Sequence, residues 1–194
     1  MTGRARLLGV VAALLAAAPA CSSGTVTVVD ASPECHAGRR LAILAQAVPT
    51  AAYVPCIAEQ DSPWRFSRLK VEEGRARLSL VYIDPSARTA RVELTRHCDT
   101  SGASALLPEP GQTDVRRFRR VPTLSPRLAG VDYAVFDGGC VTTRFDLPRN
   151  ADASERLLDL DTTVGLYPRD RLSAELERDF DLDLDAAPAA TARR

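Results

Sequence analysis

Three consecutive runs of alternating apolar and polar residues constrain the fold of this chain more than any other feature. They cover residues 64–71, 77–83 and 89–96, with short turns at Glu73-Gly74 and at residues 84–87 between them. A period of two places alternate side chains on opposite faces of a strand, so each run predicts a strand with one buried and one solvated face. The short turns indicate that the three strands form an antiparallel meander.

The alternating pattern returns later in the chain and predicts a hairpin. Residues 131–136 and 140–145 are its strands, and the turn Asp137-Gly138-Gly139 supplies the positive φ that a tight hairpin requires. We read residues 50–64 as a loop, residues 100–114 as a loop without a core pattern, and residues 115–121 as a densely basic segment. The tether before the domain is expected to end in a short strand at residues 25–29.

Helical patterns flank these strands. Residues 39–48 place apolar side chains at the i, i+3, i+4, i+7 spacing, and Pro49 ends the run. Asn150 or Asp152 can cap a short helix through residue 160, residues 163–167 suit one more strand, and Pro168 suits the start of a last helix. The sequence therefore predicts a single α+β domain: an antiparallel sheet of about four to six strands, with helices packed on one face.

The first twenty-one residues are typical of an export signal. Arg4 and Arg6 precede an acid-free apolar run at residues 7–18, and small residues lead to Cys21. The run is too short for a comfortable membrane span, which needs about 20 apolar residues. An ordinary cut after Ala18-Pro19-Ala20 would release a secreted chain that begins at Cys21.

Cys21 followed by residues 22–24 resembles the lipobox of bacterial lipoproteins, in which the cysteine receives a diacylglyceryl group. We expect this outcome, which anchors the protein on the extracytoplasmic face of the cell membrane, rather than secretion. The expected organisation is a signal peptide at residues 1–20, an anchor and tether at 21–34, the α+β domain at 35–185 and a flexible tail at 186–194.

The five cysteines agree with this interpretation. Assigning Cys21 to the lipid leaves an even set of four, which suits two disulfides in an exported protein. Four cysteines allow three connectivities, of which we favour Cys35 with Cys56 and Cys98 with Cys140. The chain has no Cys-x-x-Cys pair, so we expect no metal site and no cofactor.

Charge is nearly balanced in the mature chain of 174 residues, which has 23 basic and 25 acidic side chains. This balance argues against a nucleic-acid partner, which calls for a basic excess. One local cluster of arginines surrounds Phe118: Arg116, Arg117, Arg119 and Arg120. It could bind anionic headgroups, an envelope polymer or an envelope protein. In the alternative, these arginines pair with acidic segments of the same domain.

Three other candidate sites have ordinary structural explanations. His36 directly follows Cys35, and His97 directly precedes Cys98. A Cys–His catalytic pair needs a free thiolate, however, and a cysteine in a disulfide has none. The alternating aspartates at 179, 181, 183 and 185 could bind Ca²⁺, although a solvated strand face is favoured. Four aromatic residues could line a ligand groove, or simply belong to the core: Trp64, Tyr82, Tyr133 and Phe136.

Several turns and cysteine-containing segments form short motifs: Val48-Pro49, Val54-Pro55-Cys56-Ile57, Pro63-Trp64, Cys98-Asp99 and Gly138-Gly139-Cys140-Val141-Thr142-Thr143. These motifs resemble those of a group of uncharacterised exported actinobacterial proteins with a four-cysteine extracytoplasmic domain. The resemblance spans residues 35–180 and implies a shared fold tied by disulfides, with no active-site residue.

The resulting functional hypothesis is an exported, lipid-anchored envelope protein that binds or scaffolds another envelope component without catalysis. The alternative is an extracytoplasmic domain that binds a small ligand for transport or sensing. An enzyme with an unrecognised site comes third, because no Gly-x-Ser-x-Gly elbow or other catalytic motif is present.

Overall fold

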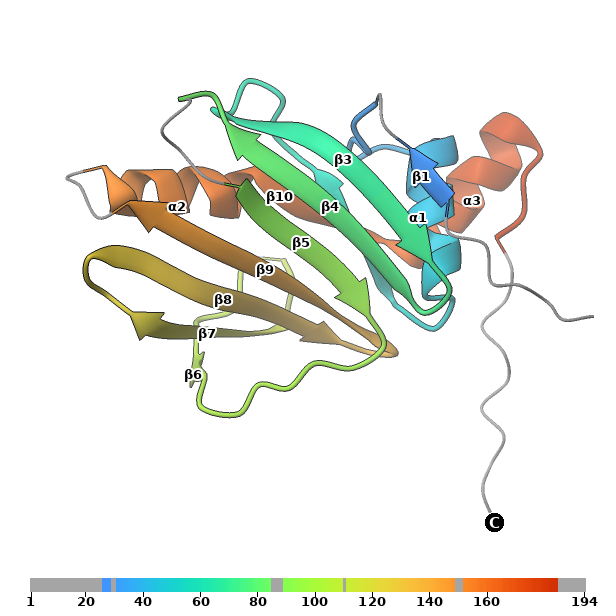
Figure 1. The fold of residues 1–194 in the computed structure, drawn as a ribbon. Coiled ribbons are helices and arrows are strands. Elements are labelled where there is room, and N and C mark those ends of the chain that lie inside the picture. The colour runs from blue at the N-terminus through green and yellow to red at the C-terminus, as the bar shows by residue number, and fades with distance from the viewer. Residues whose placement is uncertain (1–25, 29–30, 85–88, 110, 149–151, 185–194) are drawn as a thin grey trace, which may run out of the picture.

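Eight antiparallel strands form one twisted sheet in the computed structural model, which describes residues 26–28, 31–84, 89–109, 111–148 and 152–184 (Figure 1). The predicted signal peptide, Cys21 and the C-terminal tail lie outside these residues. In spatial order the strands are β1 (Val26–Val28), β3 (Trp64–Glu72), β4 (Arg75–Tyr82), β5 (Thr89–Thr95), β9 (Gly139–Pro148), β8 (Arg127–Phe136), β7 (Arg116–Thr123) and β6 (Ser104–Ala105).

A second layer covers one face of this sheet and lies behind it in Figure 1. It contains a two-stranded antiparallel ribbon of β2 (Tyr53–Ile57) and β10 (Val164–Pro168), flanked by helices. The helices are α1 (Arg39–Ala47), α2 (Ala153–Thr163) and α3 (Arg169–Phe180). Among the residues described, no helix is long and apolar enough to cross a membrane.

The core lies between these two layers, as the alternating pattern predicts. Leu69, Leu78, Leu80, Val92 and Leu94 are at most 1% exposed and point from the meander toward the helices. The single antiparallel α+β domain with helices on one face is therefore confirmed. The alternate residues of the same strands point to the opposite, uncovered face, which we call the outer face.

Both favoured disulfides are present. Cys35–Cys56 joins the segment before α1 to β2, with 5.0 Å between the Cα atoms. Cys98–Cys140 joins the segment after β5 to the start of β9, with 5.9 Å between the Cα atoms. β5 and β9 are neighbours in the sheet, so the second disulfide ties the segment that leaves β5 to the adjacent strand β9.

The sheet has more strands than the sequence predicts. The expected loop at residues 50–64 contains β2, whose ladder is with β10; on its other side a single bridge joins Ile57 to Glu34. Pro55 is tolerated because no ladder runs along that other side at Pro55. The basic segment at residues 115–121 contains β7. Arginines occupy both faces of β7, which hides the apolar–polar alternation of a half-buried strand.

The aspartate-rich segment after residue 178 is not the extended strand we expected. α3 continues to Phe180, and Asp181 ends it with a left-handed backbone (φ 52°). Phe180, the last residue of α3, is 48% exposed, whereas Leu172 and Leu176 are buried. Asp185 lies outside the described residues.

The turn between β8 and β9 docks on the segment after α1. Gly138 has a φ of +65°, and its carbonyl oxygen accepts a hydrogen bond of 2.6 Å from the Thr50 hydroxyl. A Cβ at Gly138 would overlap the Thr50 carbonyl oxygen, whereas a Cβ at Gly74, which also has positive φ, would meet open space.

These two glycines form a matched pair for a stability test. We expect Gly74→Ala to lower the free energy of unfolding by about 1–2 kcal/mol, the cost of the left-handed backbone alone. Gly138→Ala should cost at least ~3 kcal/mol, because the docked backbone must also move. Urea unfolding of the two variants measures the difference, and equal losses would contradict this docking.

Candidate functional site

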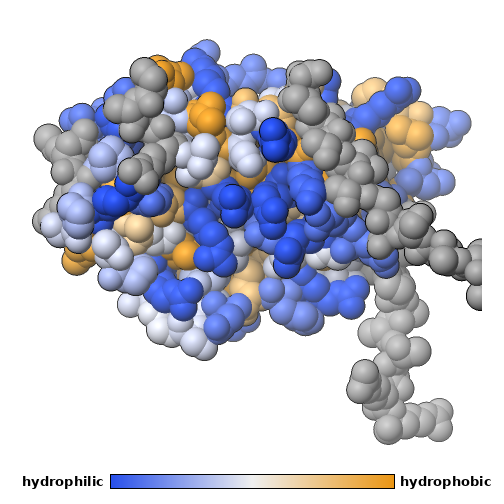
Figure 2. All heavy atoms as spheres, in the orientation of Figure 1, coloured by the Kyte–Doolittle hydropathy of each residue, from blue (hydrophilic) through white to orange (hydrophobic). Residues whose placement is uncertain are grey.

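The outer face of the sheet is strongly basic. From the strand registers, ten basic side chains point to this face, against three acidic ones. Figure 2 looks onto this side of the molecule and shows hydrophilic residues gathered over the strands. We call this surface the basic sheet face; its basic residues are Arg65, Arg68, Lys70, Arg75, Arg77, Arg91, Arg116, Arg120, Arg127 and Arg144.

The three carboxylates of this face neutralise only part of its charge. Glu93 Oε1 forms an ion pair with Arg75 Nε at 2.7 Å and accepts a hydrogen bond from Arg77 Nη2 at 3.5 Å. Glu72 pairs with Lys70, and Asp146 pairs with Arg127. Each of the three carboxylates thus forms an ion pair with a neighbouring basic residue of the same face.

Four arginines lie in one line across six neighbouring strands. Arg91 of β5 and Arg144 of β9 are direct register partners. The line continues through Ser79 of β4 to Arg68 of β3, and through Val131 of β8 to Arg120 of β7. We call Arg68, Arg91, Arg144 and Arg120 the arginine row.

The arginine row carries uncompensated charge. Among the described residues, the side chains of Arg68, Arg91 and Arg144 have no hydrogen bond or ion pair, and all three are exposed. Arg120 lies over the Tyr133 ring, 5.9 Å from its centroid, and donates to the Ser101 carbonyl oxygen at 3.1 Å. Like charges directly opposite on neighbouring strands are destabilising, so Arg91 and Arg144 repel each other.

The basic cluster predicted from the sequence does not form one patch. β7 directs Arg116 and Arg120 to the basic sheet face and turns Arg117 and Arg119 toward the second layer. Arg117 pairs there with Glu109. The alternative role, pairing with acidic groups of the same domain, therefore applies to Arg117 and Arg119.

Arg119 connects the sheet to α2. Its Nε donates to Asp132 Oδ1 at 2.6 Å, and its Nη2 donates to Asp161 Oδ2 of α2 at 2.8 Å. Hydrogen bonds to the two carboxylates raise the pKa of Arg119, so it stays charged. Burial, with the nearby Asp132 carboxylate, raises the pKa of Asp161 despite the guanidinium. A cavity of about 50 Å³ beside this cluster has room for little more than water.

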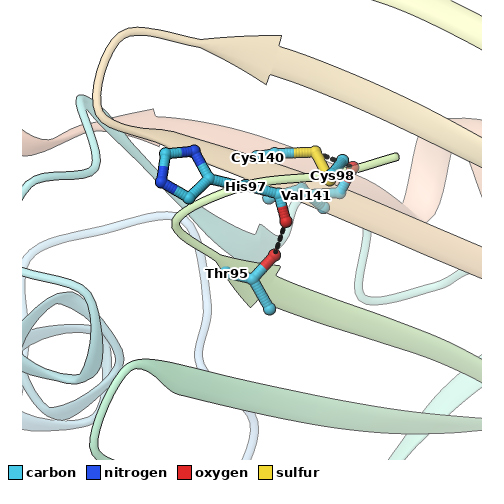
Figure 3. Close-up of a disulfide and its surroundings, with 5 residues drawn as sticks. All are labelled: Thr95, His97, Cys98, Cys140 and Val141. Carbon is cyan, nitrogen blue, oxygen red and sulfur yellow. Dashed lines mark hydrogen bonds between the residues drawn. A yellow bond between two sulfur atoms is a disulfide. The ribbon is translucent and has the colours of Figure 1, made fainter. Parts of the chain in front are cut away.

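Neither histidine lies beside a free thiol. His36 is exposed, with Nδ1 3.4 Å from Glu34 Oε2, and its neighbour Cys35 is in a disulfide. His97 is also exposed, and Figure 3 shows its ring turned away from the Cys98–Cys140 sulfurs. The hypothetical Cys–His pair is therefore not formed by these residues.

The four aromatic residues do not share a groove. Trp64 is 1% exposed, donates from its indole N–H to the Arg156 carbonyl oxygen at 2.9 Å, and meets the edge of Tyr82. Phe136 packs against Tyr53, and Tyr133 lies beneath Arg120. Within the described ranges, no group of three or more His, Cys, Asp or Glu residues is arranged to hold a metal ion.

One apolar groove of about 580 Å³ escaped the sequence analysis. It lies between α1, β3 and the segment that follows α3, so no single stretch of sequence contains it. Its lining includes the apolar residues Ile43, Ala47, Val71, Leu176, Leu182 and Leu184, together with the polar residues Arg39, Gln46, Glu72, Glu73 and Asp183.

The arginine row was also missed, although part of its signal is present in the sequence. Arg68, Arg91 and Arg144 each occupy a polar position of an alternating run. The runs alone indicate that these residues face solvent, but not that they share a line. That conclusion needs the strand order, in which β9 inserts beside β5, and the register of each pair.

Comparison with known proteins adds no assignment: no family model, curated protein or solved structure matches this chain.

The Arg119–Asp161 contact has a testable pH dependence. Because the pKa of Asp161 is raised in the folded state, folding favours its protonated form. The contribution of this group to stability is therefore greatest below its ordinary pKa of 3.8 and falls as pH rises through the raised value.

We expect Asp161→Asn to remove this slope. The unfolding free energy of the wild type minus that of the variant should decrease between about pH 3 and neutral pH, as measured by urea unfolding at several pH values. Glu155→Gln, on an exposed position of the same helix, is the control. The same slope in both comparisons would show that Asp161 is not the group responsible.

Proposed function

We propose that this protein is an exported, non-enzymatic binding domain, anchored by an acylated Cys21, whose basic sheet face binds an anionic component of the cell envelope. The observation that supports the proposal is the segregation of charge between the two layers. An unneutralised basic surface attracts anions and raises the rate at which they associate.

Net charge conceals this segregation. The basic sheet face has ten basic and three acidic side chains, whereas residues 152–184, which include α2 and α3, have four basic and ten acidic ones. The mature chain is close to neutral only because these surfaces cancel. The near-neutral net charge therefore does not exclude a polyanionic partner for this face.

The two disulfides support an oxidising compartment outside the cytoplasm. The anchor would also bring the basic sheet face near the membrane. β1 pairs with β3 at the edge of the sheet, and Val26 lies opposite Val71. Cys21 precedes Val26 by five residues, a span of at most about 17 Å. We further propose that the chain belongs with the exported actinobacterial proteins that its motifs resemble.

The apolar groove favours a second candidate function, an extracytoplasmic small-ligand-binding domain. Its volume of about 580 Å³ falls within the range of pockets that accept small molecules. Few polar groups point into it, so a ligand there would be largely apolar. This candidate ranks below the first because the charge segregation, rather than the groove, is the more pronounced feature of the described residues.

The leading proposal predicts salt-sensitive binding to the envelope that depends on one face. We would measure cosedimentation of the unanchored Cys21→Ser protein with envelope fragments of an actinobacterial host. Arg68→Glu, Arg91→Glu and Arg144→Glu together should weaken binding at least about tenfold, because charge-assisted contacts are lost.

The control reverses three exposed arginines on the helical layer: Arg40→Glu, Arg171→Glu and Arg178→Glu. It changes net charge equally and should leave binding within about threefold of wild type, since these residues lie away from the basic sheet face. Equal losses in both triple variants, or no envelope binding by the wild type, would refute the proposal.

A further inference from the structure

We infer that the arginine row is a binding site for a linear polyanion whose charges are phosphodiester groups. This inference rests on the proposed function and specifies its ligand. Four observations carry it: the Arg91–Arg144 pair, the carboxylates on both sides of the row, the length of the row, and the residues between its arginines.

The centre of the row is the Arg91–Arg144 pair. Direct register partners have Cβ atoms about 5 Å apart, so both guanidinium groups can reach one anion. Each guanidinium presents a planar fork that matches two phosphate oxygens. A phosphodiester carries its negative charge on two oxygens and accepts hydrogen bonds from two directions, so it can relieve the repulsion between these arginines.

The surroundings of the row favour a linear ligand over a flat one. Glu93 and Glu72 lie on one side of the row, toward the turn between β3 and β4, and Asp146 lies on the other. A flat anionic surface, such as a membrane, would meet these carboxylates as well as the arginines. A chain of phosphates laid along the row meets only the unneutralised positive charge.

The length of the row calls for several charges on one ligand. From Arg68 to Arg120 the row crosses five strand spacings, which is about 24 Å. A single phosphate would occupy the central pair and leave the outer arginines unused. A polymer engages the outer and central arginines together and gains affinity from each additional contact.

No aromatic side chain lies within the row itself. The positions between its arginines are Ser79 and Val131, and Tyr133 beside it is only 3% exposed beneath Arg120. Proteins that hold single-stranded nucleic acids use exposed aromatic rings as stacking platforms. The ligand is therefore recognised through its phosphates, as an envelope polymer of simple repeating units would be.

The test is calorimetric titration of the folded Cys21→Ser protein with synthetic poly(glycerol phosphate). We expect Arg91→Gln with Arg144→Gln to weaken binding at least about tenfold. The slope of log K against log salt is negative, and it should become less steep by roughly 1.4 because two phosphate contacts are lost. The matched control, Lys70→Gln with Arg127→Gln, removes two cations of the same face outside the row and should stay within about threefold of wild type.

The apo protein provides a second readout. Because Arg91 and Arg144 repel each other, the single variants Arg91→Gln and Arg144→Gln should each unfold at a higher urea concentration than wild type. Adding poly(glycerol phosphate) should raise the wild-type midpoint and raise that of the double variant by less at the same ligand concentration. A double variant that unfolds earlier than wild type would overturn the assignment of an unrelieved pair.

The other possible outcomes show whether the row, the identity of the ligand or the proposed function is wrong. Equal losses in both double variants would show that the face binds by diffuse charge, so the row is not the site. Tighter binding to polyglutamate or to phosphatidylglycerol vesicles than to poly(glycerol phosphate) would show that the ligand is not a linear phosphodiester polymer. The basic sheet face would remain the binding surface. Failure to bind any of the three polyanions, by a protein that still cosediments with envelope fragments, would overturn the inference and leave the proposed function standing. Failure in both experiments would overturn both.

Discussion

Burial of one face of the sheet beneath the β2–β10 ribbon and the helices is the constraint on which the rest of the structure depends. The strands have a period of two, so committing Leu78, Val92 and Leu94 to the core forces their neighbours onto the outer face. Those neighbours include Arg77, Arg91 and Glu93. The basic sheet face is thus a direct consequence of the way the core is built, and a one-residue slip of register would bury its charges.

Specific contacts hold the two layers in this relation. The Cys35–Cys56 disulfide fixes the entry to α1 against the ribbon, and the β8–β9 turn docks on Thr50. Arg119 joins β7 to α2 through Asp132 and Asp161. Trp64 reaches from β3 to the Arg156 carbonyl oxygen in α2. Because these contacts are spread along the sheet, the outer face has a defined shape on which a row of side chains can keep its spacing.

Local patterns in the sequence predicted what depends on local physics. The alternation at residues 64–96, the apolar stripe of α1 and the hairpin turn at Gly138 each identify an element from its own residues. The number of cysteines predicted two disulfides, and the structure contains both of the pairings that we favoured among the three possible ones. β7 was missed because arginines on both of its faces conceal the alternation, and β2 was missed because prolines surround it.

The candidate site depended on pairing between distant segments, which no local pattern contains. Arg116, Arg117, Arg119 and Arg120 are neighbours in sequence, yet β7 sends them alternately to opposite sides. Arg68, Arg91 and Arg144 are far apart in sequence, yet the strand order brings them into one line with Arg120. The cluster that is contiguous in sequence is therefore divided between two faces by the fold. The arginine row, which is scattered in sequence, forms only when the strands pair.

The most direct measurement of this charge segregation is chromatography of the mature Cys21→Ser chain on a sulfonate cation exchanger at pH 7. Its net charge is about −2, so a chain with evenly spread charge would pass through. We expect the folded protein to be retained by its basic sheet face, and the same chain, reduced and unfolded in urea, to flow through. Passage of the folded protein without retention would contradict a segregated basic face.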